Sequence, residues 1–139
     1  MLRKKVLVCI TPQSNSKRLI ERGSEIAEGE SAELHILHVA LGKNIMENDG
    51  SAQLLQKLFD YASGFGGIVH GLCGENITMT IIKFIRDEMI THLVLGEHSD
   101  GYKASSDDIT ALISAKLPYI NIHILEREKL KIDKRQNLL

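Results

Sequence analysis

The sequence predicts an α/β fold, a three-layer open sandwich in which one mostly parallel, five-stranded sheet carries helices on both faces. Three observations predict it. Short apolar runs without alternation, which are typical of strands covered on both faces, recur along the chain. Segments with apolar residues at helical spacing separate these runs. The resulting order βαβαβαβαβ, with right-handed crossovers, gives the strand order 3-2-1-4-5.

The first element is an apolar, β-branched run at residues 5–10, which we expect to be a strand buried on both faces. A proline and small polar residues follow and form a loop, in which Ser14 and Asn15 are candidates for the helix N-cap. Residues 17–28 then carry apolar side chains at helical spacing. They predict an amphipathic helix that ends near Gly29.

The middle of the chain repeats this alternation. Residues 33–39 predict the second strand, and residues 54–62 predict a second amphipathic helix that the following glycines break. Residues 68–70 predict a short third strand, after which residues 71–76 turn the chain into a third helix. The inner face of that helix is expected to carry Ile77, Ile81, Phe84, Ile85 and Glu88 or Met89.

The apolar run at residues 91–95 stops at Gly96 and predicts the central fourth strand. After a polar loop, the composition at residues 105–108 is typical of a helix start, because serine can cap it and aspartates favour the positive end of the helix dipole. The stripe of this fourth helix is expected to be Ile109, Leu112, Ile113 and Leu117. Residues 119–125 alternate and predict a final strand at an edge of the sheet or against a partner.

Size and composition fit one domain at residues 1–125, followed by a charged tail or linker stub at residues 126–139. A formal net charge of -1 argues against broad binding to nucleic acid or to an anionic membrane. No segment approaches the roughly 18 apolar residues of a membrane-spanning helix. Two cysteines without C-x-x-C spacing fit free thiols in a reducing compartment, so we expect a soluble, cytoplasmic protein.

The strongest candidate site lies where the sheet reverses its winding, between the first and fourth strands. Ligands of open α/β sheets bind beyond the carboxyl ends of the strands, so the loops after Thr11 and Gly96 border the expected crevice. Gly96 would let backbone N–H groups approach an anion, and the following helix directs its N-terminus there. The alternative, that Gly96 merely ends a strand, is about as strong for a lone glycine.

Catalytic and metal chemistry find little support in the residues. Neither the Walker A motif nor the glycine-rich dinucleotide turn is present, and the histidines lack metal-ligand spacing. His35 and His38 are expected on opposite faces of one strand. Cys9 is interpreted as a buried, inert thiol, and Asp107 and Asp108 are adjacent rather than facing. We therefore assign no catalytic residue and no metal ligand.

Four stretches carry a resemblance to a known family. They are VLVCITP at residues 6–12, SKRLIER at 16–22, AELHILHV at 32–39 and ITHLVLG at 90–96. In combination, they make the chain resemble the universal stress protein family from about residue 5 to 125. More narrowly, they resemble the universal-stress-type domain of the potassium-responsive Kdp sensor histidine kinases. The resemblance implies a Rossmann-like fold of the adenine nucleotide alpha hydrolase-like type.

The resemblance also implies a modified nucleotide loop. Nucleotide-binding members carry an acidic residue for the ribose where this chain has Thr11. They carry G-x-x-G, nine residues and G-[S/T] for the phosphates; here Gly96 matches, Ser99 and Ile109 replace the second and third glycines, and Thr110 fits the last position. Lost glycines restrict backbone approach, so tight ATP binding is not expected. The family's adenine contact maps to the backbone of Val39.

Some Kdp-kinase domains of this type are thought to bind cyclic di-AMP, through a small polar motif after the first strand and aromatic residues in the second. The family's serines correspond here to Thr11 and Gln13, and its aromatics to Leu34 and His38. Ser14 and Ser16 offer alternative hydroxyls at shifted spacing. The match to this motif is partial.

We expect a non-catalytic sensory or ligand-binding domain in stress or potassium and osmotic signalling, with ATP or cyclic di-AMP as the class of ligand and a histidine kinase as partner or parent. The expected binding residues are Thr11, Pro12, Gln13, Ser14, Val39, Gly96, His98, Ser99 and Thr110. The alternative is a ligand-free dimerisation or scaffold module that pairs through its last strand. A homodimer through that strand is also the expected assembly.

Overall fold

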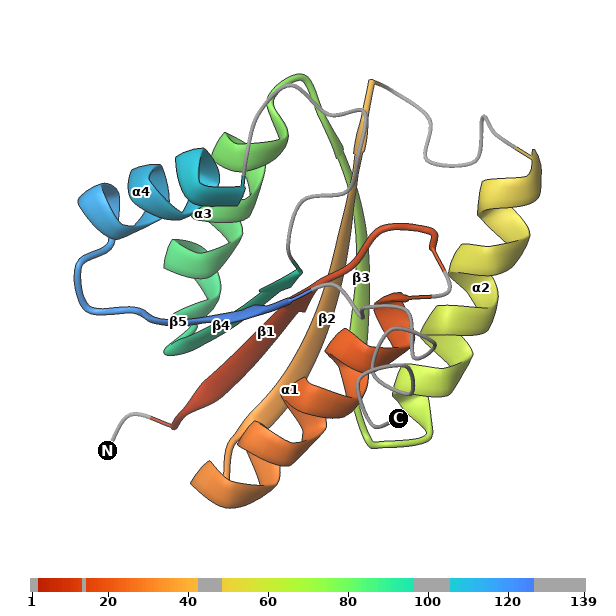
Figure 1. The fold of residues 1–139 in the computed structure, drawn as a ribbon, viewed down its shortest axis with the longest axis horizontal. Coiled ribbons are helices and arrows are strands. Elements are labelled where there is room, and N and C mark those ends of the chain that lie inside the picture. The colour runs from red at the N-terminus through yellow and green to blue at the C-terminus, as the bar shows by residue number, and fades with distance from the viewer. Residues whose placement is uncertain (1–2, 14, 43–48, 97–105, 127–139) are drawn as a thin grey trace, which may run out of the picture.

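The computed structural model describes residues 3–13, 15–42, 49–96 and 106–126. Strands and helices alternate along the chain (Figure 1). The strands are β1 (Lys5–Cys9), β2 (Glu33–Leu41), β3 (Ile68–Gly74), β4 (His92–Gly96) and β5 (Asn121–Leu125). The helices are α1 (Ser16–Glu30), α2 (Asp49–Ser63), α3 (Ile77–Glu88) and α4 (Ser106–Lys116).

The sheet has the predicted architecture. Its five strands lie in the order β3-β2-β1-β4-β5, and every neighbouring pair is parallel. On one side of β1, Val8 pairs with Ile36 of β2, and on the other it pairs with Val94 of β4. The strand order reverses between β1 and β4, as the sequence predicts. The fold class is therefore confirmed.

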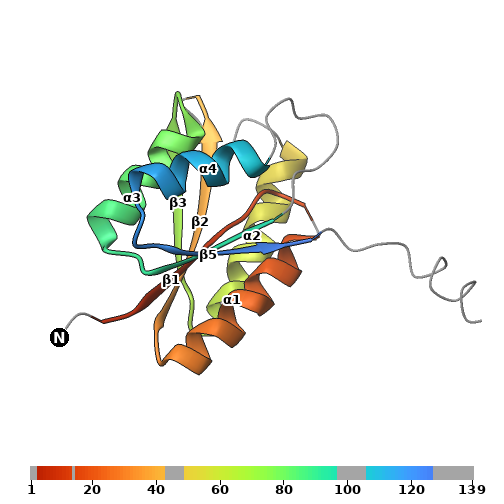
Figure 2. The ribbon, with the colours of Figure 1, turned by 60° about the vertical axis from the view of Figure 1, so that its left-hand side comes forward.

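Two helices cover each face of the sheet (Figures 1 and 2). On one face, α1 and α2 enclose a core with alternate residues of the central strands, such as Val6, Val8 and Val94. On the other face, α3 and α4 pack over the intervening residues, such as Leu7 and Leu93. This alternation explains why β1 and β4 read as continuous apolar runs, because both faces of each strand are buried.

Helix α1 lies unusually close to the central strands. A Cβ placed on Gly23 would come within 2.2 Å of Val8 Cγ2 and 3.3 Å of Leu34 Cδ1. The helix ends at Glu30, near Gly29 as predicted, where Ser31 takes the left-handed conformation and its N–H donates to the carbonyls of the last turn. Met89 ends α3 by the same device. Both helices thus close on non-glycine residues with positive φ.

The start of α1 differs from the predicted capping. Asn15 occupies the N-cap position, but its conformation is helical and its side chain makes no cap hydrogen bond. Its Oδ1 instead accepts a hydrogen bond from Arg18 Nη1 at 3.1 Å. The other candidate, Ser14, lies outside the described residues. Asn15, one of the two candidates, is therefore the N-cap residue, but its side chain does not cap the helix.

Strand β3 is longer than predicted. The sequence limits it to residues 68–70, whereas the pairing with β2 continues to the pair Leu41 and Gly74. The N–H of Gly42 adds a hydrogen bond of 3.1 Å to the Gly74 carbonyl. The glycines that resemble turn residues are held in the strand because β2 itself extends to Leu41. Asn76 then caps α3 by accepting from the N–H of Met79 at 3.0 Å.

The inner faces of the last two helices were only partly predicted. In α3, Ile81 and Ile85 are buried as expected, but Ile77 is exposed and Ile82 takes an inner position. Ile77 is the first residue of the helix and lies beyond the part that packs on the sheet. In α4, Leu112 is exposed, whereas Ile113 and Leu117 are buried.

A pair of histidines links β2 to β3 on the face covered by α3. His35 Nε2 lies 3.0 Å from Glu33 Oε1, and His35 Nδ1 lies 3.0 Å from His70 Nε2. Because a carboxylate accepts only, His35 donates from Nε2 and His70 donates to its free Nδ1. Burial and the nearby His35 lower the pKa of His70, with Glu88 opposing them. His38 lies on the other side of the strand, as predicted.

We expect Gly23→Ala to lower the free energy of unfolding by about 1–3 kcal/mol, because the new methyl group overpacks the contact with the buried, stiff side chain of Val8. Urea denaturation measures this. Gly29→Ala in the same helix is the control, since a Cβ there meets nothing within 4 Å and should raise stability by up to about 1 kcal/mol. Equal losses in both variants would contradict the close contact.

We expect stability to fall as pH drops below about 6.5, in part because the unfolded chain protonates His70 at its ordinary pKa whereas the folded chain does so only at lower pH. His70→Gln keeps an N–H donor for His35 but cannot titrate. Urea denaturation at pH 7.5 and 5.5 should show a smaller pH-dependent loss for this variant. An exposed change on α2, Gln53→Ala, should leave the loss as in the parent protein.

Candidate functional site

The loop after β1 borders the predicted crevice and is held by one buried serine. Ser16 Oγ donates to the carbonyl of Thr11 at 2.7 Å and accepts from the Thr11 N–H at 3.3 Å. The Ser16 side chain is therefore fully occupied and is not an alternative hydroxyl for a ligand. Thr11 and Gln13 are exposed and Pro12 is half-buried, so this short loop presents polar groups at the carboxyl end of β1.

Gly96 ends β4, where it pairs with Leu125 of β5. A Cβ at this position would lie 3.2 Å from Leu19 Cδ1 and 3.5 Å from Leu19 Cδ2. Packing of α1 against β4 is therefore one reason for a glycine here, independent of any ligand. This contact supports the alternative that Gly96 serves the strand end, and it leaves the proposed role in anion binding untested.

Of the remaining predicted residues, the structure describes Val39 and Thr110. Val39 is buried in β2, where it pairs with Leu72 of β3. Thr110 is half-buried in α4. Ser14, His98 and Ser99 lie outside the described residues. The structure thus brings the Thr11 loop and Gly96 to adjacent strands, β1 and β4, and leaves the predicted site as a whole untested.

His38 is a neighbour of this edge that the predicted binding set omits. Its side chain is buried, and its Nδ1 lies 3.0 Å from the carbonyl oxygen of Ile10 at the end of β1. Because a carbonyl only accepts, His38 carries its proton on Nδ1. The signal for it was the resemblance, which matched His38 to an aromatic position in the second strand. Its role here is to tie β2 to the start of the Thr11 loop.

The described cysteines near this edge show no sign of an activated nucleophile. Burial raises the pKa of the Cys9 thiol to about 12, so the interpretation of an inert thiol is supported. Cys73 is exposed on β3. Within residues 3–13, 15–42, 49–96 and 106–126, no group of three or more His, Cys, Asp or Glu side chains could hold a metal ion. No helix among these residues is long and apolar enough to span a bilayer.

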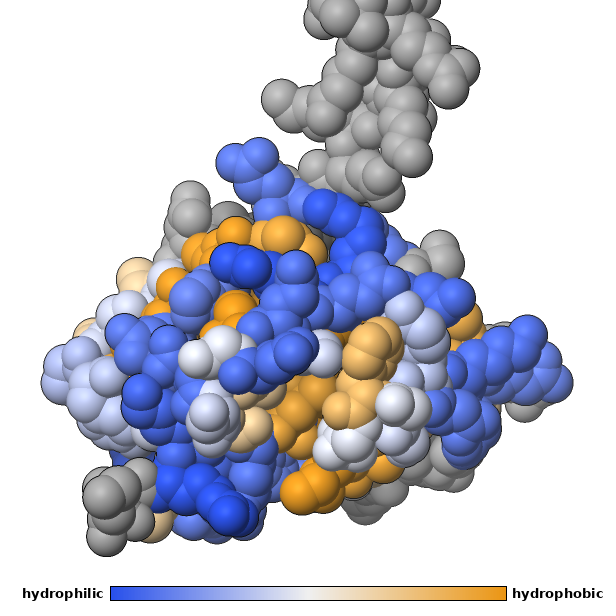
Figure 3. Space-filling model, turned by 90° about the horizontal axis from the view of Figure 1, so that it is seen from below, coloured by the Kyte–Doolittle hydropathy of each residue, from blue (hydrophilic) through white to orange (hydrophobic). Residues whose placement is uncertain are grey.

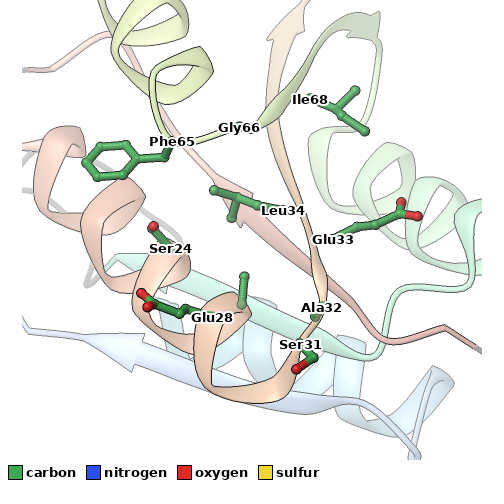
Figure 4. A pocket seen from close by; sticks show the side chains of 10 residues that line it. Ser24, Glu28, Ser31, Ala32, Glu33, Leu34, Phe65, Gly66 and Ile68 are labelled. Atoms are coloured by element: carbon green, nitrogen blue, oxygen red, sulfur yellow. The ribbon is translucent and has the colours of Figure 1, made fainter.

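Two depressions lie at the opposite, amino-terminal edge of the sheet, which Figure 3 views directly. The first, of about 450 Å³, lies between α1 and the start of β2. Its buried floor includes Ala27 and Leu34, and its rim carries Phe65, Ile68 and Glu28 (Figure 4). The second, of about 560 Å³, is called here the His92 depression. It is lined by Lys4, Ile26, Gly29, Glu30, His92, Asn121 and His123.

Comparison with known proteins gives a partial sequence match. No family model matches the chain. The chain is 32% identical over 94 residues to the sensor protein KdpD of Mycobacterium tuberculosis strain H37Rv, and the same holds for the protein of strain CDC 1551 / Oshkosh. The match covers 68% of this chain but 11% of each relative. The chain therefore spans about a tenth of the length of these curated relatives.

Solved structures show the same fold over nearly the whole chain. A universal stress protein in complex with cAMP has a TM-score of 0.65 at 16% identity, covering 92% of this chain and 100% of that one. A universal stress protein from Archaeoglobus fulgidus in complex with dAMP has a TM-score of 0.63 at 14% identity, covering 92% and 100%. The protein UspA from Lactobacillus plantarum has a TM-score of 0.60 at 15% identity, covering 90% and 99%. The chain thus has the fold of the universal stress proteins and is similar in sequence to a segment of the sensor protein KdpD.

Proposed function

We propose that this domain binds an adenine nucleotide, without catalysis, in the crevice between the loops after β1 and β4. The observation that carries the proposal is the reversal of strand order between these strands, in a fold whose solved neighbours include complexes with cAMP and dAMP. The exposed Thr11 loop lies at this point, held open to solvent by the Ser16 bridge to its backbone.

The proposed contacts divide by the part of the ligand. In the proposed complex, the ribose contacts Thr11, Pro12, Gln13 and Ser14. The adenine contacts the backbone of Val39. The phosphates contact the segment from Gly96 to Thr110, which includes His98 and Ser99. Thr11 offers one hydroxyl where a carboxylate would accept from both ribose hydroxyls, and Ser99 and Ile109 stand where glycines would admit phosphate. These differences favour weak ATP binding or a ligand of the cyclic di-AMP class.

The biological setting we propose is sensory. The match to a segment of KdpD supports a place in stress or potassium and osmotic signalling, with a histidine kinase as partner or parent. Among the described residues, Cys9 is no candidate nucleophile, because burial raises the pKa of its thiol to about 12. Residues 126–139 would then act as a tail or as a linker to another part of such a system.

Restoring a carboxylate at the ribose position should strengthen binding. We expect Thr11→Asp to tighten AMP binding about tenfold, because a hydrogen bond to a charged group contributes about 1.5–3 kcal/mol. Isothermal titration with AMP, ATP, cAMP and cyclic di-AMP gives the affinities, and ¹H–¹⁵N NMR should place the shift changes at Thr11 and Gly96. Asn15→Asp, which adds the same charge in the same loop, should give no gain. No heat and no shift changes for any of these ligands at millimolar concentration would overturn the proposal.

A second candidate function is a dimerisation module, favoured by the last strand. Strand β5 lies at the edge of the sheet and pairs with β4 alone among the described residues. Ile124 in this strand is 41% exposed, and Tyr119, which precedes the strand, is 57% exposed. An uncharged edge strand with exposed apolar side chains is a template for pairing with a second copy.

If β5 forms the dimer, Ile124→Lys should shift the protein toward the monomer in sedimentation velocity, because a charge would be buried in the joined edge. Ile68→Lys is the matched control, since Ile68 is 48% exposed on β3 at the other edge of the sheet. A parent protein that is monomeric up to several hundred micromolar would rule this function out. Equal dissociation by both variants would assign the contact to another surface.

A further inference from the structure

The His92 depression contains a polar cluster that the proposed function does not use. His92 of β4 and His123 of β5 lie with their rings nearly parallel, at an interplanar angle of 16° and 6.1 Å between centroids. Glu30, the last residue of α1, places its Oε1 4.0 Å from His92 Nε2. The same Oε1 accepts a hydrogen bond of 2.7 Å from Lys4 Nζ. The cluster thus joins α1, β4, β5 and the residues before β1.

Hydrogen bonding on the other side of the ring determines where neutral His92 carries its proton. Thr91 Oγ1 donates to the carbonyl of Lys5 at 3.0 Å and accepts from the Lys5 N–H at 3.0 Å. We assign the single proton of this hydroxyl to the Lys5 carbonyl, and with this assignment His92 Nδ1 donates in the contact of 2.8 Å to Thr91 Oγ1. Neutral His92 therefore has a bare lone pair on Nε2, and this atom faces Glu30.

Glu30 is ionised at neutral pH. The hydrogen bond from Lys4 and its charge lower the pKa of this carboxyl, and the charges of His92 and His123 act in the same direction. Two hydrogen-bond acceptors, His92 Nε2 and Glu30 Oε1, therefore face each other across 4.0 Å with no proton between them. His92 is 9% exposed, and it lines the His92 depression.

The cluster around His35 and His70, on the opposite face of the sheet, shows such a cluster with its hydrogen bond between histidine and carboxylate formed. There, His35 Nε2 donates to Glu33 Oε1 at 3.0 Å, and Glu33 also binds Arg3 at 2.7 Å. Both clusters consist of a basic residue ahead of β1, a carboxylate and a buried histidine. They differ in one proton. His35 Nε2 carries a proton that it donates to Glu33, whereas Nε2 of neutral His92 carries none.

We propose that the His92 cluster is a proton-binding site that clamps the end of α1 to β4. A proton taken from solvent binds to His92 Nε2, and the new N–H donates to Glu30 Oε1 while Nδ1 continues to donate to Thr91. Closing the gap from 4.0 Å to hydrogen-bond distance draws the last turn of α1 toward β4. Glu30 is then held by Lys4 and His92 together.

The surrounding groups disfavour a second proton on His123. Burial lowers the pKa of His123, and the charges of His92 and of Arg22 on α1 lower it further, with only Glu30 opposing. Protonation of His123 is therefore disfavoured, and a charge on His92 disfavours it further. The described ionisable groups that face the pair are Arg22 and Glu30 from α1 and Lys4 from the segment before β1.

Long-range ¹H–¹⁵N NMR of the histidine rings, from pH 8 to 5, tests the proposal in the intact protein. The neutral form of His92 should carry its proton on Nδ1, and acidification should add one on Nε2. Glu30→Gln should move the midpoint of the His92 titration to lower pH, because the carboxylate that favours the charged ring is gone. Glu28→Gln, an exposed carboxylate in the same last turn, should leave the midpoint unchanged.

Two results would overturn the proposal. One is a neutral His92 that carries its proton on Nε2 in the parent protein, which requires no variant to fold. The other is a His92 midpoint that Glu30→Gln leaves within error of the parent value. Neither measurement involves a nucleotide, so this site stands or falls independently of the crevice.

Discussion

The contact between α1 and the two central strands is the constraint on which the rest of the structure depends. It is made at three points by small residues: Ser16 against the backbone of Thr11, Gly96 against Leu19, and Gly23 against Val8. A methyl group at Gly23 would require α1 or Val8 to shift, whereas one at Gly96 would make only a tight contact with the Leu19 side chain. The helix therefore connects the two ends of the domain, with the proposed nucleotide crevice at its start and the His92 cluster at its end.

Several polar groups in this core have their hydrogen bonds provided by neighbouring residues. His38 donates to the Ile10 carbonyl, and the chain of Glu33, His35 and His70 supplies a donor for each acceptor. Buried polar groups are costly unless paired, so these contacts also restrict how β2 and β3 sit beside β1. The His92 cluster departs from that pattern, since two acceptors face each other. Departures of this kind are where binding of a further species is expected.

The sequence predicts the fold well because its signals are local. Continuous apolar runs identify β1 and β4 as central, and the alternation after Pro118 places β5 at an edge. The errors arise where contacts with residues distant in the sequence determine the local structure. Residues 71–74 resemble a turn because of their glycines, yet the extended β2 holds them in a strand. The exposure of Ile77 likewise depends on where α3 begins relative to the sheet, which helical spacing alone does not give.

The candidate site was predictable in position but not in detail. Its place at the reversal of strand order follows from topology, and the Thr11 loop and Gly96 lie on the adjacent strands expected. The occupation of the Ser16 hydroxyl, the packing of Leu19 on Gly96 and the proton position on His38 depend on contacts between residues distant in sequence or on loop geometry. None of these three features produces a recognisable pattern in a single amino-acid sequence.

The two left-handed helix ends have a consequence for how this domain tolerates change. Ser31 and Met89 each hold a positive φ that glycine adopts freely and that costs other residues about 1–2 kcal/mol. The fold therefore carries backbone strain at these two positions. A single substitution by glycine at either helix end would relieve it there. A lineage carrying this domain can offset destabilising changes elsewhere, including changes in its ligand loops, without altering the core.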